Sequence, residues 1–336
     1  MSVVAQYKSQ VDEELGRFFT GRELGKDGIE LRVISALKEF TMRGGKRVRP
    51  LFMILGYWLN SDIDERIIRA SISLELMQSY LLIHDDIIDQ SPTRRGGPSF
   101  HKMWNYEERM NEGISIVAAD LADAYSHEIL LSNDFPPENL NRAMMAMSET
   151  VEMTGIGQLM DITMPLKDKV TLSEVTKVHV MKTAHYTVNG PMKMGAYLSG
   201  YPNVGLIDHY GIPLGIAFQI QDDILGMYGD EKTLGKPVTS DFEEGKMTHL
   251  ILNAFDLASE NDIKFIKKFL GKPGISQSDF EEVRNIIKSS GALAKTKELA
   301  LSYYNKAISS IPELTDDSMK VKELEEMAKR MVDRIN

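Results

Sequence analysis

The chain has 336 residues and no cysteine, which excludes disulfides, thiolate zinc sites and a cysteine nucleophile. Any metal must therefore bind through oxygen or imidazole ligands. There is no charge-free apolar run of about 18 residues, and the first residues lack the basic and then apolar pattern of a signal peptide. We therefore expect a soluble, cytoplasmic protein without a membrane span.

Basic residues are in the minority, 39 against 49 acidic ones, and the formal charge of −10 argues against a nucleic-acid partner. Four motifs are also missing: GxxxxGK[ST], GxGxxG, HExxH and GxSxG. Their absence argues against nucleotide hydrolases, dinucleotide enzymes, zinc proteases and serine hydrolases of the usual kind. The seven histidines, including His179 and His249, are scattered. We interpret most of them as ordinary polar or core residues.

Apolar residues recur mainly at spacings of three and four from about residue 31 onward, which is typical of helices. One such stripe predicts a long helix over residues 68–87. The pattern returns at 214–225 and, with more charge, at 280–287 and 324–331. There is no convincing strand alternation, no long Gly/Ser or Pro-rich linker and no internal repeat. We predict a single all-α domain over residues 1–336.

The most informative stretch is HDDIID at residues 84–89. On a helix, Asp85 and Asp89 stand one turn apart on the same face, where their carboxylates repel each other. A cation between them would relieve the repulsion, and oxygen ligands favour a hard ion, Mg²⁺ first. A solvated acidic helix end before the breaker at Ser91 and Pro92 would give the same pattern.

A second acidic helix end, Gln221-Asp222-Asp223, follows the later apolar stripe, so the two ends could face each other across one cavity. Short basic segments of the kind that bind phosphate lie at 44–50, 93–96, 181–183 and 235–237. Each segment alone could be a solvated surface turn. Together they indicate a site where metal ions and cationic side chains share a polyanionic substrate.

These motifs resemble those of the trans-isoprenyl diphosphate synthases, which join isopentenyl diphosphate to an allylic diphosphate. The resemblance rests on GGKRVRP at 44–50, QSYLLIHDDIID at 78–89, TRRG at 93–96, GQLMD at 157–161, KT at 182–183, FQIQDD at 218–223, and GKPVTSD at 235–241 with Lys246. It implies an all-α bundle of mostly antiparallel helices around a deep central cavity, and a homodimer.

The resemblance also implies roles for individual residues. Asp85, Asp89 and Asp222 would bind three Mg²⁺ ions, which Mn²⁺ could replace. The allylic diphosphate site would add Arg94, Lys182, Thr183, Gln219, Lys236 and Lys246. The isopentenyl diphosphate site would contain Lys46, Arg49, Gln78 and Arg95. Gln78 stands where many family members have histidine, and both side chains can donate to a phosphate oxygen.

In the family's reaction, the allylic C–O bond ionises and the metal ions stabilise the departing diphosphate. Thr183, Gln219 and the carbonyl of Lys182 would direct oxygen dipoles at the carbocation, and an apolar cavity would keep water away from it. The diphosphate itself would act as the base. One departure stands out, because Gly226 occupies the third aspartate position of the second acidic motif, so no ligand is expected there.

The resemblance further implies that the residues four and five before the first aspartate, Leu81 and Tyr80, form the floor of the elongation cavity. Met77, one turn earlier, is the next candidate. A single aromatic at the fifth position resembles archaeal-type enzymes that make twenty-carbon geranylgeranyl diphosphate. Spacing alone leaves Tyr80 about 140° around the helix from Asp85, so Tyr80 could merely continue the core stripe.

We therefore predict a prenyltransferase that extends dimethylallyl, geranyl and farnesyl diphosphates, with geranylgeranyl diphosphate as the main product. Farnesyl or longer-chain diphosphates are the alternative products. A class I terpene cyclase shares an aspartate-rich motif but should lack GGKRVRP. The second alternative is a regulatory subunit that has lost its chemistry, and it is opposed by six intact residues: Asp85, Asp89, Arg94, Arg95, Lys182 and Lys236.

Overall fold

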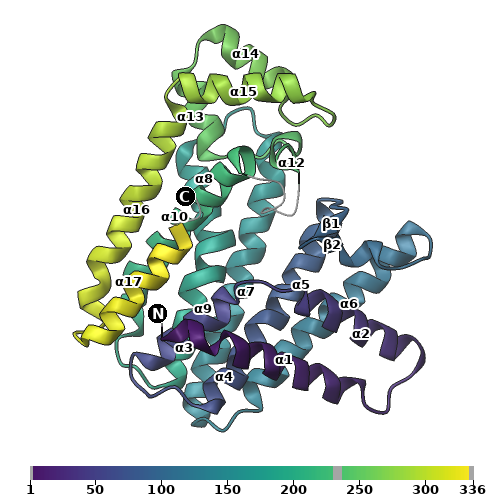
Figure 1. Cartoon of the computed structure of the whole chain (residues 1–336), viewed down its shortest axis with the longest axis vertical. Helices are drawn as coiled ribbons and strands as arrows, with labels where there is room; N and C mark the ends of the chain where they lie inside the picture. The colour runs from purple at the N-terminus through teal and green to yellow at the C-terminus, as the bar shows by residue number, and fades with distance from the viewer. Residues whose placement is uncertain (1–2, 230–236, 333–336) are drawn as a thin grey trace. The chain divides into compact units, whose positions relative to one another are not determined.

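The computed structural model describes residues 3–229 and 237–332, which are predominantly helical (Figure 1). The all-α prediction is confirmed. The chain forms two compact units, of which unit 1 comprises Met1–Met147 and Pro191–Val204, and unit 2 comprises Ser148–Gly190 and Gly205–Asn336. Each unit is assembled from separate stretches of sequence. One domain over residues 1–336 around a central cavity stays a prediction.

Unit 1 contains mainly helices, among which α5 packs against α6. Its elements are η1 (Val4–Tyr7), α1 (Lys8–Glu23), α2 (Gly28–Met42), α3 (Val48–Trp58), α4 (Glu65–Ser71), α5 (Ser73–Ile88), β1 (Thr93–Arg94), β2 (Gly97–Pro98), η2 (Phe100–Lys102) and α6 (Glu108–Leu131). Helix α7 (Pro137–Thr163) begins in unit 1 and ends in unit 2, and most of α9 (Gly190–Leu198) belongs to unit 1.

Unit 2 is built around α10, which packs against η4 and also against α16, whose place is labelled in Figure 1. Its elements are η3 (Met164–Leu166), α8 (Leu172–Val178), η4 (His179–Asn189), η5 (Val204–Leu206, shared with unit 1), α10 (Ile207–Tyr228), α12 (Ser240–Glu243), α13 (His249–Leu257), α14 (Glu260–Phe269), α15 (Gln277–Ser289), α16 (Ala292–Leu314) and α17 (Ser318–Val332). In the described ranges, no helix combines the length and apolar character needed to cross a membrane.

The helix predicted over residues 68–87 is divided at Ile72 into α4 and α5. The Ile72 N–H donates to the Arg69 carbonyl at 3.4 Å, a tighter turn than an α-helix makes. The Ser71 hydroxyl donates to the Ile68 carbonyl at 2.7 Å. The apolar stripe continues across this turn, so periodicity alone does not reveal the division.

The sequence showed no strand alternation, yet β1 and β2 form a two-stranded antiparallel hairpin. Its turn residues, Arg95 and Gly96, both have positive φ, 52° and 76°. Positive φ at both central positions is the geometry of a type I′ turn, which matches the twist of the flanking strands. Strands of two residues carry no readable period, so the prediction missed them. The hairpin is what presents Arg94 and Arg95.

The KT motif at residues 182–183 lies on η4, a π-helical segment in which the hydrogen-bond spacing is wider than in an α-helix. Such segments are rare and frequently occur at functional sites. Gly215 of α10 lies so close to η4 that a Cβ there would be 2.4 Å from Ala184 Cα. Only glycine permits this approach, which brings the functional residues of α10 next to those of η4.

Candidate active site

The first acidic motif occupies the C-terminal turn of α5 in unit 1. Asp85 belongs to the helix, and Asp89 caps it with helical φ and ψ of −81° and −3°. The Asp89 N–H donates to the Asp85 carbonyl at 2.9 Å, so the helical path continues through Asp89. The predicted one-turn spacing of the two aspartates is therefore confirmed.

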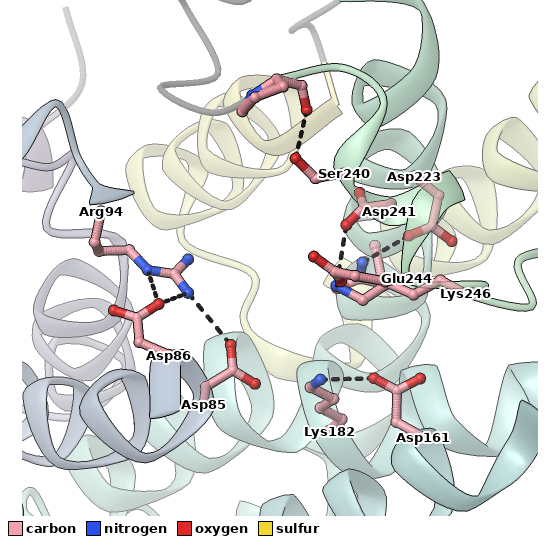
Figure 2. Close-up of polar contacts among 12 residues, drawn as sticks. Asp85, Asp86, Arg94, Asp161, Lys182, Asp223, Ser240, Asp241, Glu244 and Lys246 are labelled. Atoms are coloured by element: carbon pink, nitrogen blue, oxygen red, sulfur yellow. Dashed lines mark hydrogen bonds and ion pairs between the residues drawn. The ribbon is translucent and has the colours of Figure 1, made fainter. Parts of the chain in front are cut away.

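Arg94 of the hairpin lies against this helix end (Figure 2). Its Nε donates to Asp86 Oδ1 at 2.8 Å, its Nη2 contacts the same oxygen, and Nη2 lies 3.4 Å from Asp85 Oδ2. Asp86 is fully buried. Burial raises the pKa of the Asp86 carboxyl, while the Arg94 guanidinium acts in the opposite direction. Asp86 thus holds a cation in position beside Asp85.

Three of the four predicted isopentenyl diphosphate residues converge in unit 1. With its amide oxygen facing the two guanidiniums, the buried Gln78 accepts from Arg49 Nη1 at 3.0 Å and from Arg95 Nη2 at 2.7 Å. Arg95 Nη1 also donates to the Gly44 carbonyl at 3.2 Å. Lys46, the fourth, is exposed on the same glycine-rich loop. A glutamine, two arginines and a loop therefore form one basic cluster.

Arg47 lies in the sequence between Lys46 and Arg49, two predicted diphosphate-binding residues, but its environment differs from theirs. Its guanidinium is buried and contacts Asp12, Glu75 and the Thr41 carbonyl. Its backbone adopts a left-handed conformation, φ 52°, just before α3 begins. Arg47 thus anchors the loop to α1 and α5, whereas Arg49 belongs to the basic cluster and Lys46 is exposed on the loop.

The predicted floor residues lie on α5, where Met77 is fully buried while Tyr80 and Leu81 are partly buried. The Tyr80 ring contacts the His84 ring edge-on, with centroids 5.0 Å apart. Burial raises the pKa of the Tyr80 phenol, and the charges of Asp123 and Asp120 on α6 add to this. Tyr80 is thus fixed by packing, with acidic side chains of α6 in its surroundings.

In unit 2, Lys182 on η4 donates to Asp161 Oδ2 on α7 at 2.7 Å (Figure 2). The next residue, Thr183, is buried and donates to Gln219 Oε1 at 2.6 Å. Gln219 Nε2 donates in turn to Asp223 Oδ1 at 2.8 Å. The KT motif and the second acidic motif, predicted from separate segments, are therefore joined by direct hydrogen bonds.

Asp222 is half-buried near the C-terminal end of α10, and Gly226 follows one turn later. A Cβ on Gly226 would lie 2.6 Å from Asp241 Oδ2. Asp241 Oδ1 accepts from Lys246 Nζ at 3.0 Å, and Lys246 also lies 2.8 Å from Glu244 (Figure 2). Lys236, predicted for the allylic site, lies outside the described residues.

The predicted metal ligands are all carboxylates, which are the kind of oxygen ligand that Mg²⁺ prefers. Within residues 3–229 and 237–332, no group of three or more histidine, aspartate or glutamate residues could hold a metal ion alone. Mg²⁺ in proteins usually keeps several waters and takes one or two carboxylates together with substrate phosphates. Asp85 with Asp89 in unit 1, and Asp222 in unit 2, offer donor sets of this kind, with the remaining positions open to phosphate oxygens.

Several polar residues contact the predicted site although no role was predicted for them. Asp86, Asp161 and Asp223 lie within the quoted motifs, and each is paired with a predicted residue. Asp241 could have been found in the same way, because it closes the GKPVTSD segment. His179, interpreted as an ordinary polar residue, lies 3.2 Å from Asp223. No signal in the sequence distinguishes it from the other histidines.

Comparison with known proteins agrees with this geometry. A family model described as polyprenyl synthetase matches residues 32–287. A geranylgeranyl diphosphate synthase from Sulfolobus acidocaldarius is 34% identical over 281 residues, covering 82% of each chain. A geranylfarnesyl diphosphate synthase from Aeropyrum pernix is 29% identical over 300 residues, covering 86% of this chain and 91% of the relative.

The fold also matches a crystal structure of geranylgeranyl pyrophosphate synthase from Corynebacterium glutamicum, complexed with isoprenyl diphosphate and magnesium. The TM-score is 0.92 at 28% identity, covering 98% of this chain and 99% of the other. The family model spans more than half of the chain, and the chain covers most of the archaeal relative. The chain therefore belongs to the polyprenyl synthetase family and is a prenyltransferase that elongates isoprenyl diphosphates.

Proposed function

We propose that this polyprenyl diphosphate synthase condenses isopentenyl diphosphate with dimethylallyl, geranyl and farnesyl diphosphates, and that geranylgeranyl diphosphate is its main product. The observation that carries the product length is the α5 floor, where one aromatic, Tyr80, is followed by the aliphatic Leu81. The relatives include a geranylgeranyl diphosphate synthase at 34% identity and a geranylfarnesyl diphosphate synthase at 29%, so family membership alone leaves the product length open. Farnesyl diphosphate is the second candidate.

The basic cluster of Arg49, Gln78 and Arg95, with Lys46 on the adjoining loop, binds the diphosphate of isopentenyl diphosphate in this proposal. Guanidiniums bind phosphate oxygens through two parallel hydrogen bonds, and lysine adds a point charge. Gln78 supports the assignment because its oxygen accepts from both arginines at 3.0 and 2.7 Å. Gln78 lies between two guanidiniums whose like charges repel each other.

The allylic diphosphate is bound by Arg94, Lys182, Lys236 and Lys246, with Thr183 and Gln219 beside the reacting carbon. Each described cation of this set is already paired: Arg94 with Asp86, Lys182 with Asp161, and Lys246 with Asp241. Such pairing fixes long side chains before the substrate arrives, which lowers the entropy cost of binding. The Thr183 and Gln219 oxygens supply the dipoles that stabilise positive charge.

We further propose that Asp85, Asp89 and Asp222 hold three Mg²⁺ ions, which Mn²⁺ can replace. When bound, the metal supplies Lewis-acid stabilisation of the negative charge on the diphosphate leaving group. The chain's own groups orient the two diphosphates, keep water from the cation and position the Gln219 dipole. No protein base is assigned to the final deprotonation, because the released diphosphate can accept that proton.

A second copy of this chain is the proposed partner of α6. The inner face of α6 is buried, whereas apolar residues of its outer face are exposed: Met110, Ile116, Val117, Leu121 and Leu131. Val117 is 60% exposed. An apolar stripe along one helix face is typical of protein interfaces. In sedimentation analysis, V117E with L121E should give monomers, while L301E, at a similarly exposed leucine of α16, should leave the dimer intact.

Incubation with isopentenyl diphosphate, each allylic primer and Mg²⁺, followed by product chromatography, tests the activity and the product length. Excess chelator should abolish turnover, and Mg²⁺ should restore it. Asp85→Ala should lower kcat by several orders of magnitude in a folded protein, whereas Asp316→Ala, at an exposed loop aspartate, should not. Near-normal turnover by folded Asp85→Ala would refute the metal assignment.

A further inference from the structure

Two hydrogen bonds, one from Thr183 to Gln219 and one from Gln219 to Asp223, fix the Gln219 amide at both ends. Its oxygen accepts from Thr183 at 2.6 Å, and its nitrogen donates to Asp223 at 2.8 Å. An amide oxygen cannot donate and an amide nitrogen cannot accept, so these two partners define which end points where. The oxygen keeps a second lone pair, which can face a positive charge.

Asp223 extends this chain of contacts to a histidine. Its second oxygen, Oδ2, lies 3.2 Å from His179 Nε2, an ion-pair distance. The Asp223 side chain is 10% exposed and that of His179 is 6% exposed. A carboxylate with so little contact with water is stabilised by a nearby cation, and His179 in its protonated form is the cationic group at this distance.

His249 holds the His179 ring in place. The two rings meet edge-on with centroids 4.8 Å apart, and His249 Nε2 lies 2.9 Å from Thr176 Oγ1. Burial, together with the neighbouring His179, lowers the pKa of His249 to about 4. His249 is therefore neutral at pH 7 and packs against His179 without competing for Asp223.

The arrangement follows from two helices in close contact. His179 and Thr183 lie four residues apart on η4, and Gly215, Gln219 and Asp223 are spaced by four on α10. Gly215 allows α10 to approach Ala184 of η4. Two polar contacts thus connect the two helices, one between Thr183 and Gln219 and one between His179 and Asp223.

We propose that His179 is a positioning residue for the condensation reaction: it anchors Asp223, which orients the Gln219 amide toward the developing allylic cation. This inference rests on the proposed function, in which Gln219 stabilises that cation. It gives Asp223 a role distinct from that of Asp222, since Asp223 acts through Gln219 and not through the metal.

A double-mutant cycle tests the inference, with kcat, both KM values and the half-saturating Mg²⁺ concentration as readouts. His179→Phe should lower kcat about 10- to 100-fold, with KM and Mg²⁺ dependence within about twofold of the wild type. In a Gln219→Leu background the same change should cost less than about twofold, because the amide that it orients is already gone. His185→Phe, at another histidine of η4, serves as the matched control.

His179→Gln keeps an N–H donor and should retain most of the activity, which separates positioning from simple packing. It also serves if His179→Phe fails to fold. Equal loss from His179→Phe with and without Gln219, or a raised Mg²⁺ requirement, would overturn the positioning role while leaving the proposed function intact. A wild-type protein that makes no prenyl product would instead refute the proposed function, and the inference with it.

Discussion

Replacement of Arg47 by alanine should destabilise the fold rather than weaken substrate binding. The Arg47 side chain is 1% exposed, and its Nε donates to Asp12 at 2.7 Å while Nη1 contacts Glu75, which is 3% exposed. Removing one partner of a buried ion pair costs about 3–5 kcal/mol, because the other charge stays buried without compensation. With an unfolding entropy of about 2.1 cal/mol/K per residue, or about 0.7 kcal/mol/K for 336 residues, Tm should fall by about 4–7 °C.

Thermal unfolding of Arg47→Ala and Arg49→Ala measures this contrast within one motif. Arg49→Ala should leave Tm nearly unchanged and raise the KM for isopentenyl diphosphate. The double variant Arg47→Met/Glu75→Leu should recover most of the lost stability, because it removes both buried charges together. An Arg47→Ala protein with wild-type Tm and a raised KM would show that Arg47 contacts substrate, contrary to its buried pairing.

Three other predictions use separate assays. Arg49→Ala should raise the KM for isopentenyl diphosphate by about 10- to 100-fold, because it removes a phosphate contact that contributes about 1.5–3 kcal/mol. Lys236→Ala should instead raise the KM for the allylic substrate. Equal effects of both variants on both substrates would contradict this division. Tyr80→Ala should shift products to twenty-five carbons or more and Leu81→Phe toward fifteen; unchanged lengths would place the floor elsewhere, with Met77 next. The pKa of His249 is about 4 in the folded chain and 6.5 in the unfolded one, so between these pH values only the unfolded chain binds a proton there. The free energy of unfolding should therefore decrease by up to about 3 kcal/mol as the pH is lowered from 6.5 to about 4, and His249→Leu should lack this contribution.

The helical architecture could be predicted because amphipathic helices repeat their apolar residues every three or four positions. The prediction was less complete for features that depend on local hydrogen bonds, because these leave no periodic pattern of apolar residues in the sequence. The division at Ile72 is a single tight backbone turn, the hairpin has two-residue strands, and η4 is an 11-residue segment with wider hydrogen-bond spacing. Each of these features is too short for the spacing of apolar residues to reveal it.

The motifs of the candidate site could be predicted from the sequence, whereas the contacts between their side chains in the folded protein could not. Asp85 and Asp89 are neighbours through helical spacing alone, so the sequence suffices for them. The contact of Gln78 with Arg49 and Arg95 depends on how a loop, a helix and a hairpin pack. His179 gives no signal at all, because its partner Asp223 belongs to a different helix.

The glycine at position 226 leaves room for a carboxylate of α12 in unit 2. Asp241 Oδ2 lies 2.6 Å from the position that a Cβ on residue 226 would occupy, and Lys246 holds Asp241 there at 3.0 Å. A side chain at 226 would have to displace Asp241, and an aspartate there would bring two carboxylates together, where they repel each other. Residue 226 must therefore lack a Cβ for Asp241 and Lys246 to keep this arrangement beside the last turn of α10.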